Sequence, residues 1–212
     1  MNLRDTAQAY DRLAPHYDAR WRRYLDETLD RALRYLEGSA PQQLLEVGCG
    51  TGEFLRRLRI RYPKAVLAGI DPAAGMLAVA RRKLGDDPRL RVHGARAEAL
   101  PFRSGRFDAV LCVNALHCVR GASGAMGEMA RVLRSGGRLV AVDWCRDAWW
   151  GGLLDRWCRW VDASHVRMYT TEALQRMMDA AGVRVIRTER FRVSGPGPLR
   201  AWEMMACVAE KP

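Results

Sequence analysis

Long apolar runs are absent from this chain of 212 residues. No stretch approaches the roughly 20 apolar residues that a membrane-spanning helix requires, so the sequence predicts no membrane span. No signal peptide precedes Arg4 and Asp5, and we therefore expect a cytoplasmic protein. Lysine is scarce, at positions 64, 83 and 211 only, so the net charge of +11 comes almost entirely from arginine.

The arginines are scattered at helix-face spacings, as in Arg56, Arg57, Arg59 and Arg61, and do not form an aromatic-interleaved basic groove. This dispersal favours solvated helix faces and predicts no tight, specific binding to nucleic acid. Acidic substrates and anionic membrane surfaces remain compatible with so basic a chain.

Paired cysteines are missing too. The six cysteines, at 49, 112, 118, 145, 158 and 207, include no Cys-x-x-Cys and no obvious metal spacing. We expect buried free thiols and no bound metal. Hydrophobic residues make up 49% of the chain, enough for a full core, and the length suits a single domain.

The most informative stretch runs from Leu44 to Gly52, where an apolar run ends in an acidic residue and three alternating glycines. A helical pattern follows, so the order is strand, tight turn and helix start. Glycine permits positive φ there and lets the backbone approach a ligand, while the amides of a helix start favour polar or anionic groups. A second apolar segment ends in Asp71, 19 residues beyond Gly52, which can accept hydrogen bonds from both ribose hydroxyls of an adenosine.

Two nucleotide-like ligands fit this layout. A dinucleotide fingerprint reads Gly-x-Gly-x-x-Gly, but here the glycines are at 48, 50 and 52, and Phe54 occupies part of the expected small-residue region. The segment Glu46-Val47-Gly48-Cys49-Gly50-Thr51-Gly52 instead resembles motif I of the class I S-adenosylmethionine (SAM) dependent methyltransferases. Three later blocks share the resemblance, at 69–72 with Met76, at 97–102 followed by 107–110, and at 132–139. Their order is similar to that of the small-molecule branch, such as the ubiquinone and menaquinone C-methyltransferases.

Apolar and helical segments alternate, which predicts a parallel sheet with right-handed crossovers. We expect strands at 43–47, 65–70, 89–93, 107–113 and 138–143, with helices at 51–60, 73–84 and 122–134. A helix at 171–181, capped by Thr170, and strands at 183–193 and 201–210 follow. The resemblance implies an α/β fold, a three-layer α/β/α Rossmann-like sandwich with a seven-stranded, mostly parallel sheet and an antiparallel last strand. We expect one domain over 1–212, with an N-terminal helical segment at 1–38 and a lid insertion at 144–169.

The resemblance implies SAM as the cofactor, with the glycine loop on its methionine part and ribose, and Asp71 on the ribose hydroxyls. The lead-in Tyr-Asp-Arg-x-Ala-x-x-Tyr-Asp, which begins at Tyr10, folds over the cofactor in the similar family; packing of its tyrosines on the core is the alternative. Arg96 departs from the family, because it replaces an aspartate that receives the adenine amino group, and arginine cannot accept that bond. The expected cofactor-binding residues are Tyr10, Tyr17, Glu46, Gly48, Cys49, Gly50, Gly52, Asp71, Pro72, Met76, Ala97, Glu98 and Asn114.

The predicted catalytic residues are His117, Asp143 and His165. His117 is a candidate general base or orienting group, Asp143 ends a strand at the same edge, and His165 follows a tryptophan-rich segment. A helical apolar face in that segment is expected to roof the site over a small, hydrophobic or aromatic methyl acceptor. It comprises Trp150, Leu153, Leu154, Trp157 and Val161.

Two other functions stay open at this point. A nucleic-acid (RNA) methyltransferase is suggested by charge alone, but the expected Asn/Asp-Pro-Pro-aromatic motif is replaced by Asn114-Ala115-Leu116-His117. A non-catalytic SAM-binding protein is the second alternative, and Arg96 counts slightly for it. The sequence predicts neither the attacking atom of the acceptor nor the oligomeric state.

Overall fold

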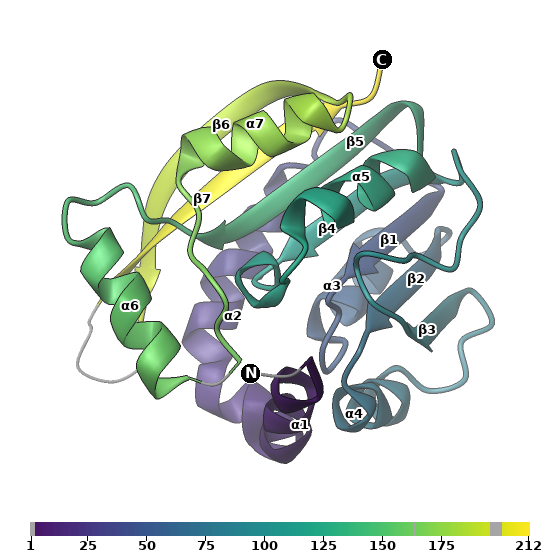
Figure 1. Ribbon diagram of the computed structural model, residues 1–212. Coiled ribbons are helices and arrows are strands. Elements are labelled where there is room, and N and C mark those ends of the chain that lie inside the picture. The colour runs from purple at the N-terminus through teal and green to yellow at the C-terminus, as the bar shows by residue number, and fades with distance from the viewer. Residues whose placement is uncertain (1–2, 163, 196–200) are drawn as a thin grey trace.

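The computed structural model describes residues 3–162, 164–195 and 201–212. In these residues seven strands form one sheet in the order β3-β2-β1-β4-β5-β7-β6 (Figure 1). β7 pairs antiparallel with β5 and β6, and the other pairings are parallel. The expected α/β fold with an antiparallel last strand is therefore confirmed. The strands are β1 (Gln43–Val47), β2 (Val66–Asp71), β3 (Leu90–Gly94), β4 (Phe107–Val113), β5 (Leu133–Trp144), β6 (Arg184–Ser194) and β7 (Ala201–Glu210).

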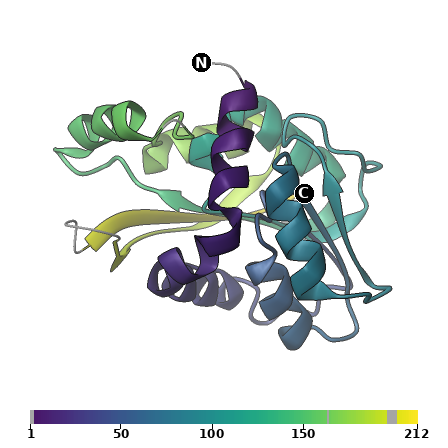
Figure 2. The ribbon, with the colours of Figure 1, turned by 90° about the horizontal axis from the view of Figure 1, so that it is seen from below.

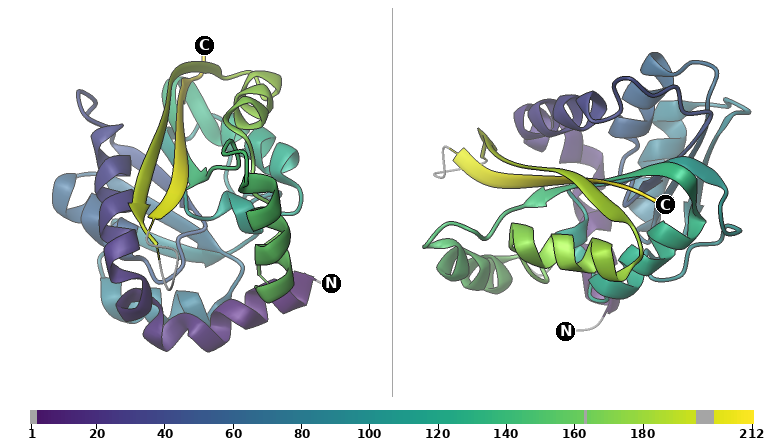
Figure 3. Two further views of the ribbon diagram at one scale, coloured as in Figure 1. Left: turned by 90° about the vertical axis from the view of Figure 1, so that its left-hand side faces the viewer. Right: turned by 90° about the horizontal axis from the view of Figure 1, so that it is seen from above.

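Helices cover both faces of the sheet, as Figures 2 and 3 show. Leu29 of α2 and Leu55 of α3 belong to the core on one face, whereas Met129 of α5 and Leu174 of α7 belong to the core on the other. No helix within the described residues has the length and apolar character that crossing a membrane requires. The helices are α1 (Leu3–Leu13), η1 (Ala14–His16), α2 (Tyr17–Arg34), α3 (Glu53–Arg61), α4 (Ala74–Leu84), η2 (Leu116–Cys118), α5 (Ala122–Val132), α6 (Gly151–Val161) and α7 (Thr171–Ala180).

The continuous apolar sequence of β4 follows from its burial on both faces of the sheet. Ala109 and Leu111 pack into one core, and Val110 and Cys112 pack into the other. Because side chains alternate between faces and both faces are covered, nearly every residue of the strand is buried.

The strand β5 differs most from its prediction, because it begins at Leu133 instead of 138. Its pairing with β4 shifts between Phe107 and Ala109, whose partners are Leu133 and Arg138. Gly136 lies inside this irregular part with a φ of +69°. The glycines thus permit a bulge inside β5, whereas the predicted strand began only after them.

The N-terminal helices are joined by polar contacts to elements beyond the carboxyl ends of β1 and β2. Asp11 of α1 accepts a hydrogen bond of 2.6 Å from the Gly75 amide, in the first turn of α4. Asp18 of α2 accepts hydrogen bonds from the Thr51 hydroxyl at 2.5 Å and from Lys83 Nζ at 2.6 Å. These contacts hold α1 and α2 across the edge of the sheet where parallel strands bind ligands.

The helix α6 is attached to the rest of the chain by its polar and small residues. The buried Asp155 accepts hydrogen bonds from His165 Nε2 at 2.8 Å and from the Met168 amide at 2.7 Å. Of the apolar face expected to roof the site, Leu153, Trp157 and Val161 are exposed, and only Leu154 packs against the core. That expectation is wrong, because Asp155 finds its buried partners on the opposite side of the helix.

The packing of α3 can be tested by a matched pair of substitutions. Leu55 is fully buried and Ile60 is exposed on the same helix. We expect Leu55→Ala to lower the free energy of unfolding by about 2–5 kcal/mol, because the truncation leaves a cavity. Ile60→Ala is the control and should change it by less than about 0.5 kcal/mol. Urea denaturation measures both, and equal midpoints for the two variants would contradict the assigned packing.

Candidate functional site

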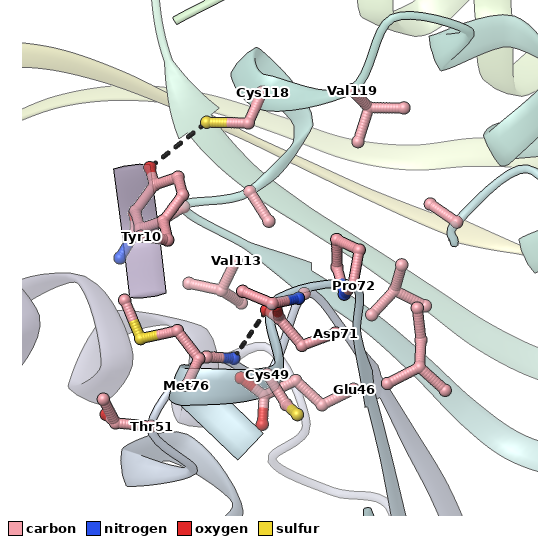
Figure 4. A pocket seen from close by; sticks show the side chains of 18 of the residues that line it. Tyr10, Glu46, Cys49, Thr51, Asp71, Pro72, Met76, Val113, Cys118 and Val119 are labelled. Carbon is pink, nitrogen blue, oxygen red and sulfur yellow. Dashed lines mark hydrogen bonds between the residues drawn. The ribbon is translucent and has the colours of Figure 1, made fainter. Parts of the chain in front are cut away.

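A cavity of about 540 Å³ lies beyond the carboxyl ends of β1, β2 and β4 (Figure 4). Its wall contains all of the expected cofactor-binding residues except Gly52. Gly52 has a φ of +76° at the start of α3, and a Cβ there would lie 2.9 Å from Leu84 Cδ1. This glycine therefore serves the close packing of α3 on α4.

The glycine loop is fastened to β2 by its own amides. The amides of Gly48 and Cys49 donate to the carbonyl of Ile70 at 2.8 and 2.9 Å. Gly48 has a φ of +78°, and a Cβ on it would lie 2.4 Å from the Ala115 Cβ. Only glycine fits there, so the loop can run directly beneath the segment that follows β4.

Asp71 ends β2 with both carboxylate oxygens bonded to backbone amides. Oδ2 accepts from Gly50 at 2.9 Å, and Oδ1 accepts from Ala73 at 2.8 Å. Burial raises the pKa of Asp71 to about 6, although the two hydrogen bonds act to lower it. Each oxygen keeps a second lone pair, so the ionised carboxylate can still accept hydrogen bonds from a ligand.

Glu46 places a second carboxyl group at the same cavity. It is buried, and its Oε2 has no hydrogen-bond partner among the described residues. Burial, reinforced by the charge of Asp71, raises the pKa of Glu46 well above its usual range. A buried acceptor without a partner costs free energy, so a ligand that brings an N–H or a cationic group here would be stabilised.

Arg96 and Glu98 lie together at the other end of the cavity. Arg96 Nη2 lies 3.3 Å from Glu98 Oε1, and the Gly121 amide donates to the same oxygen at 3.3 Å. Partial burial raises the pKa of Glu98, but these partners outweigh it and lower the pKa overall. Arg96, which replaces the aspartate of the similar family, therefore lies beside Glu98, whose ionised carboxylate can accept a hydrogen bond.

Asn114, which follows β4, is the one residue other than glycine with positive φ among those described, at +57°. Its Oδ1 accepts from the Tyr24 hydroxyl at 2.8 Å, and its Nδ2 donates to Thr28 Oγ1 at 2.8 Å. Trp144 Nε1 donates to the same Tyr24 hydroxyl at 2.8 Å. The side chain of Asn114 is therefore bound to α2, and its backbone is what the cavity can use.

His117 and Asp143 form a buried pair outside the wall of this cavity. His117 Nδ1 lies 2.7 Å from Asp143 Oδ1, and the imidazole stacks on Trp144 with ring centroids 4.1 Å apart. Burial lowers the pKa of His117, but Cys118 and Asp143 more than offset this and hold it well above its usual range. This direction favours the charged imidazole, which suits an orienting group better than a general base.

A smaller cavity of about 40 Å³ reaches His117. Three residues, Tyr10, Tyr17 and Asn114, line both cavities, so the two adjoin. The remaining wall consists of Leu13, Trp21, Tyr24, His117, Trp144, Asp162 and Ser164.

His165 lines neither cavity. Its Nε2 bonds to Asp155, its Nδ1 has no partner among the described residues, and burial lowers its pKa. Its ring centroid lies 5.4 Å from that of Trp144, so it contacts the site only through other rings.

Cys118 is a partly exposed cysteine that the sequence did not single out. Its thiol lines the larger cavity and lies 3.2 Å from the Tyr10 hydroxyl (Figure 4). The other five cysteines are buried. Its position in the sequence carries no signal, because Cys118 has the same apolar neighbours as the buried thiols, and its partial exposure is visible only in the structure.

We expect thiol reagents to modify Cys118 first. Iodoacetamide should label this cysteine faster than the five buried ones, because alkylation requires access to the thiol. Peptide mass spectrometry after brief treatment of the folded protein gives the measurement, and Cys118→Ser should remove the fast phase. Faster labelling of any other cysteine would contradict the described exposure.

In a comparison with known protein families, residues 45–141 match the family model described as a methyltransferase domain. A demethylmenaquinone methyltransferase of Thermus thermophilus is 37% identical over 146 residues, which cover 63% of this chain and 63% of that protein. A malonyl-[acyl-carrier protein] O-methyltransferase of Geobacter sulfurreducens is 36% identical over 140 residues, which cover 65% and 52%. The chain spans about half to two thirds of the length of these relatives.

Two solved structures illustrate the fold. The [4+2]-cyclase SpnF has a TM-score of 0.81 at 20% identity, covering 100% of this chain and 97% of that one. Geranyl diphosphate C-methyltransferase from Streptomyces coelicolor, in complex with Mg²⁺, geranyl diphosphate and S-adenosyl-L-homocysteine, has a TM-score of 0.71 at 15% identity and covers 88% and 77%. Such identities show a shared fold alone, and one fold carries different activities.

Proposed function

We propose that this chain, whose residues 45–141 match the model of the methyltransferase domain family, is a SAM-dependent methyltransferase that acts on a small, hydrophobic or aromatic acceptor. The observation that carries the proposal is the larger cavity, where the glycine loop meets Asp71 and the unpartnered oxygen of Glu46. An adenosine ribose and a cationic amino acid group are the donors that such a pair of carboxyl groups selects.

The residues of the larger cavity fit SAM. Asp71 would accept the ribose hydroxyls, Glu46 Oε2 would accept the amino group of the methionine part, and Gly48 lets the loop backbone approach it. Pro72 and Met76 line the cavity where they can contact the adenine. SAM supplies a methyl group already activated by a positive sulfur, so the protein has to align the acceptor and exclude water.

The acceptor is proposed to occupy the part of the cavity next to Cys118, with its polar atom directed towards His117. The charged imidazole would donate a hydrogen bond to an acceptor oxygen and favour its anionic, nucleophilic form. Asp143 holds the His117 ring, and His165 acts as a positioning residue behind Trp144. The segment 144–169 serves as a lid through its residues at the smaller cavity, which are Trp144, Asp162 and Ser164.

The names of the relatives support a small-molecule acceptor. One is named for demethylmenaquinone and the other for a malonyl group on a carrier protein. A quinone ring or an acidic acyl group is therefore the acceptor class to test first. Neither relative points to a nucleic-acid acceptor or to a non-catalytic role.

SAM affinity should depend on pH through Asp71. Protonation below its pKa of about 6 removes an acceptor, so affinity is full above that pH and should fall about tenfold per unit below it. Asp71→Asn should bind SAM more weakly and lose this pH dependence, since it cannot ionise. Titration calorimetry between pH 7 and pH 5 provides the measurement, with melting temperatures as the folding control. An unchanged pH profile in the variant would remove Asp71 from the site.

His117→Gln should reduce turnover while leaving SAM affinity nearly unchanged, because His117 lies outside the wall of the larger cavity. We expect a loss of at least about tenfold in kcat. Wild-type turnover should decline as pH rises through the pKa of His117, because the charged form is the active one. His16→Gln is the exposed control. A screen of quinone and carboxylic acid acceptors supplies the assay, and equal kcat in both variants would argue against the role of His117.

A further inference from the structure

The outward surface of α6 is apolar and aromatic. Trp149 (92%), Leu153 (69%), Trp157 (49%), Trp160 (84%) and Val161 (48%) are all exposed. Among the described residues these are five of the nine exposed large hydrophobic side chains, gathered in 13 consecutive positions. Single exposed apolar residues are ordinary, but such a concentration marks an interaction surface.

Four of these residues belong to α6, and Trp149 lies in the turn before it. Leu153, Trp157 and Trp160 follow one another at spacings of four and three, which places their side chains in a row. The buried side of α6 is made of Gly151, Asp155 and Cys158. Leu154 and Cys158 pack on the core, but most of the large apolar side chains of the helix face solvent.

Positive charge borders this apolar face. Arg156 is exposed on α6 itself. The side chains of Arg146 and Arg159 are 38% and 43% exposed, and their guanidinium groups pair with Asp155 at 3.9 and 3.2 Å. Arg190, 60% exposed, lies 3.8 Å from Asp147 in the segment that leads into α6. Arg156 therefore adds an exposed positive charge to the same helix as Trp157 and Trp160.

The acidic residues of the same segment are directed to donors within the protein. Asp147 accepts a hydrogen bond from the Thr171 amide at 3.1 Å, and Asp155 is buried. Asp162 accepts from the Ser164 amide and hydroxyl at 2.8 and 2.6 Å. The charge that this surface presents to a partner is therefore mainly that of arginine.

The surface lies beside the proposed acceptor side of the site. Figures 1 and 3 show α6 at the outer side of the molecule, with its C-terminal end towards α1. Leu13 at the end of α1, Asp162 and Ser164 meet in the wall of the smaller cavity. A flat partner bound along α6 would therefore also approach the rim of that cavity.

We propose that the α6 surface, formed by Trp149, Leu153, Trp157, Trp160 and Val161 with Arg156 and Arg159, binds an anionic lipid bilayer. Helices of this kind lie in the interface plane, with tryptophan and leucine at the boundary of headgroups and acyl chains. Arginines beside them pair with anionic headgroups. A second copy of the chain fits less well, because two surfaces of a protein with net charge +11 would repel one another.

Co-sedimentation with vesicles tests the proposal on the full chain. The protein should sediment with vesicles of phosphatidylcholine that contain about 30% phosphatidylglycerol. Added salt should lower the sedimented fraction, and vesicles of phosphatidylcholine alone should bind less protein. Trp157→Ala/Trp160→Ala should lower the partition coefficient at least about tenfold. Arg156→Glu should weaken binding to the anionic vesicles and leave the weak binding to phosphatidylcholine unaltered.

Matched controls distinguish binding through the α6 surface from non-specific binding to vesicles. Ile60→Ala/Ile186→Ala removes two exposed apolar residues elsewhere, and Arg82→Glu removes an exposed arginine of α4. Both should bind like the unaltered protein, and all variants should keep their melting temperature and SAM affinity. Equal sedimentation of the Trp157→Ala/Trp160→Ala variant and the unaltered protein, or no binding to anionic vesicles, overturns the proposal. A dimer in sedimentation velocity that this variant loses, without vesicle binding, would assign the surface to a second copy instead.

Discussion

The hydrogen bonds that fasten the glycine loop to β2 determine the rest of the site. Two loop amides share the carbonyl of Ile70, and a third reaches the carboxylate of Asp71. Because the loop is thus fixed at both sides of the strand end, α3 begins where it can pack on α4. The Asp18 contacts with Thr51 and Lys83 then bring the N-terminal helices over the same edge. The shape of the larger cavity and the position of the N-terminal helices beside it therefore depend on how the loop is held at the end of β2.

The fold could be predicted because its signals are local. The glycine loop, the acidic strand end and the buried run of β4 each specify their own conformation, and the alternation of segments specifies the topology. The direction of α6 could not be predicted in this way. Periodicity identifies an apolar face, but which side is buried was decided by Asp155, whose partners His165 and Met168 come after the helix and have no periodic pattern.

The candidate site likewise has features that the sequence predicts and features that it does not. The cofactor-binding positions could be predicted from the glycine motif and from the acidic residue that ends β2. The structure brings nearly all of them to one cavity. The charge state of His117 depends on Asp143, which lies 26 residues away, and on the neighbouring Cys118. The binding of the Asn114 side chain to α2 depends on Tyr24 and Thr28, more than 80 residues earlier. Such long-range pairings have no signature in a single sequence.

The two carboxyl groups of the larger cavity, Glu46 and Asp71, also affect the lifetime of the protein in the cell. Both have raised pKa values, so ionisation of Glu46 and Asp71 weakens the unliganded fold as pH rises through those values. A ligand whose donors meet these oxygens removes that cost and shifts the folding equilibrium by mass action. Since proteases act on opened chains, cellular abundance of such a protein should track the supply of its own ligand. The carboxyl groups that select the cofactor thereby also make turnover of the polypeptide responsive to it.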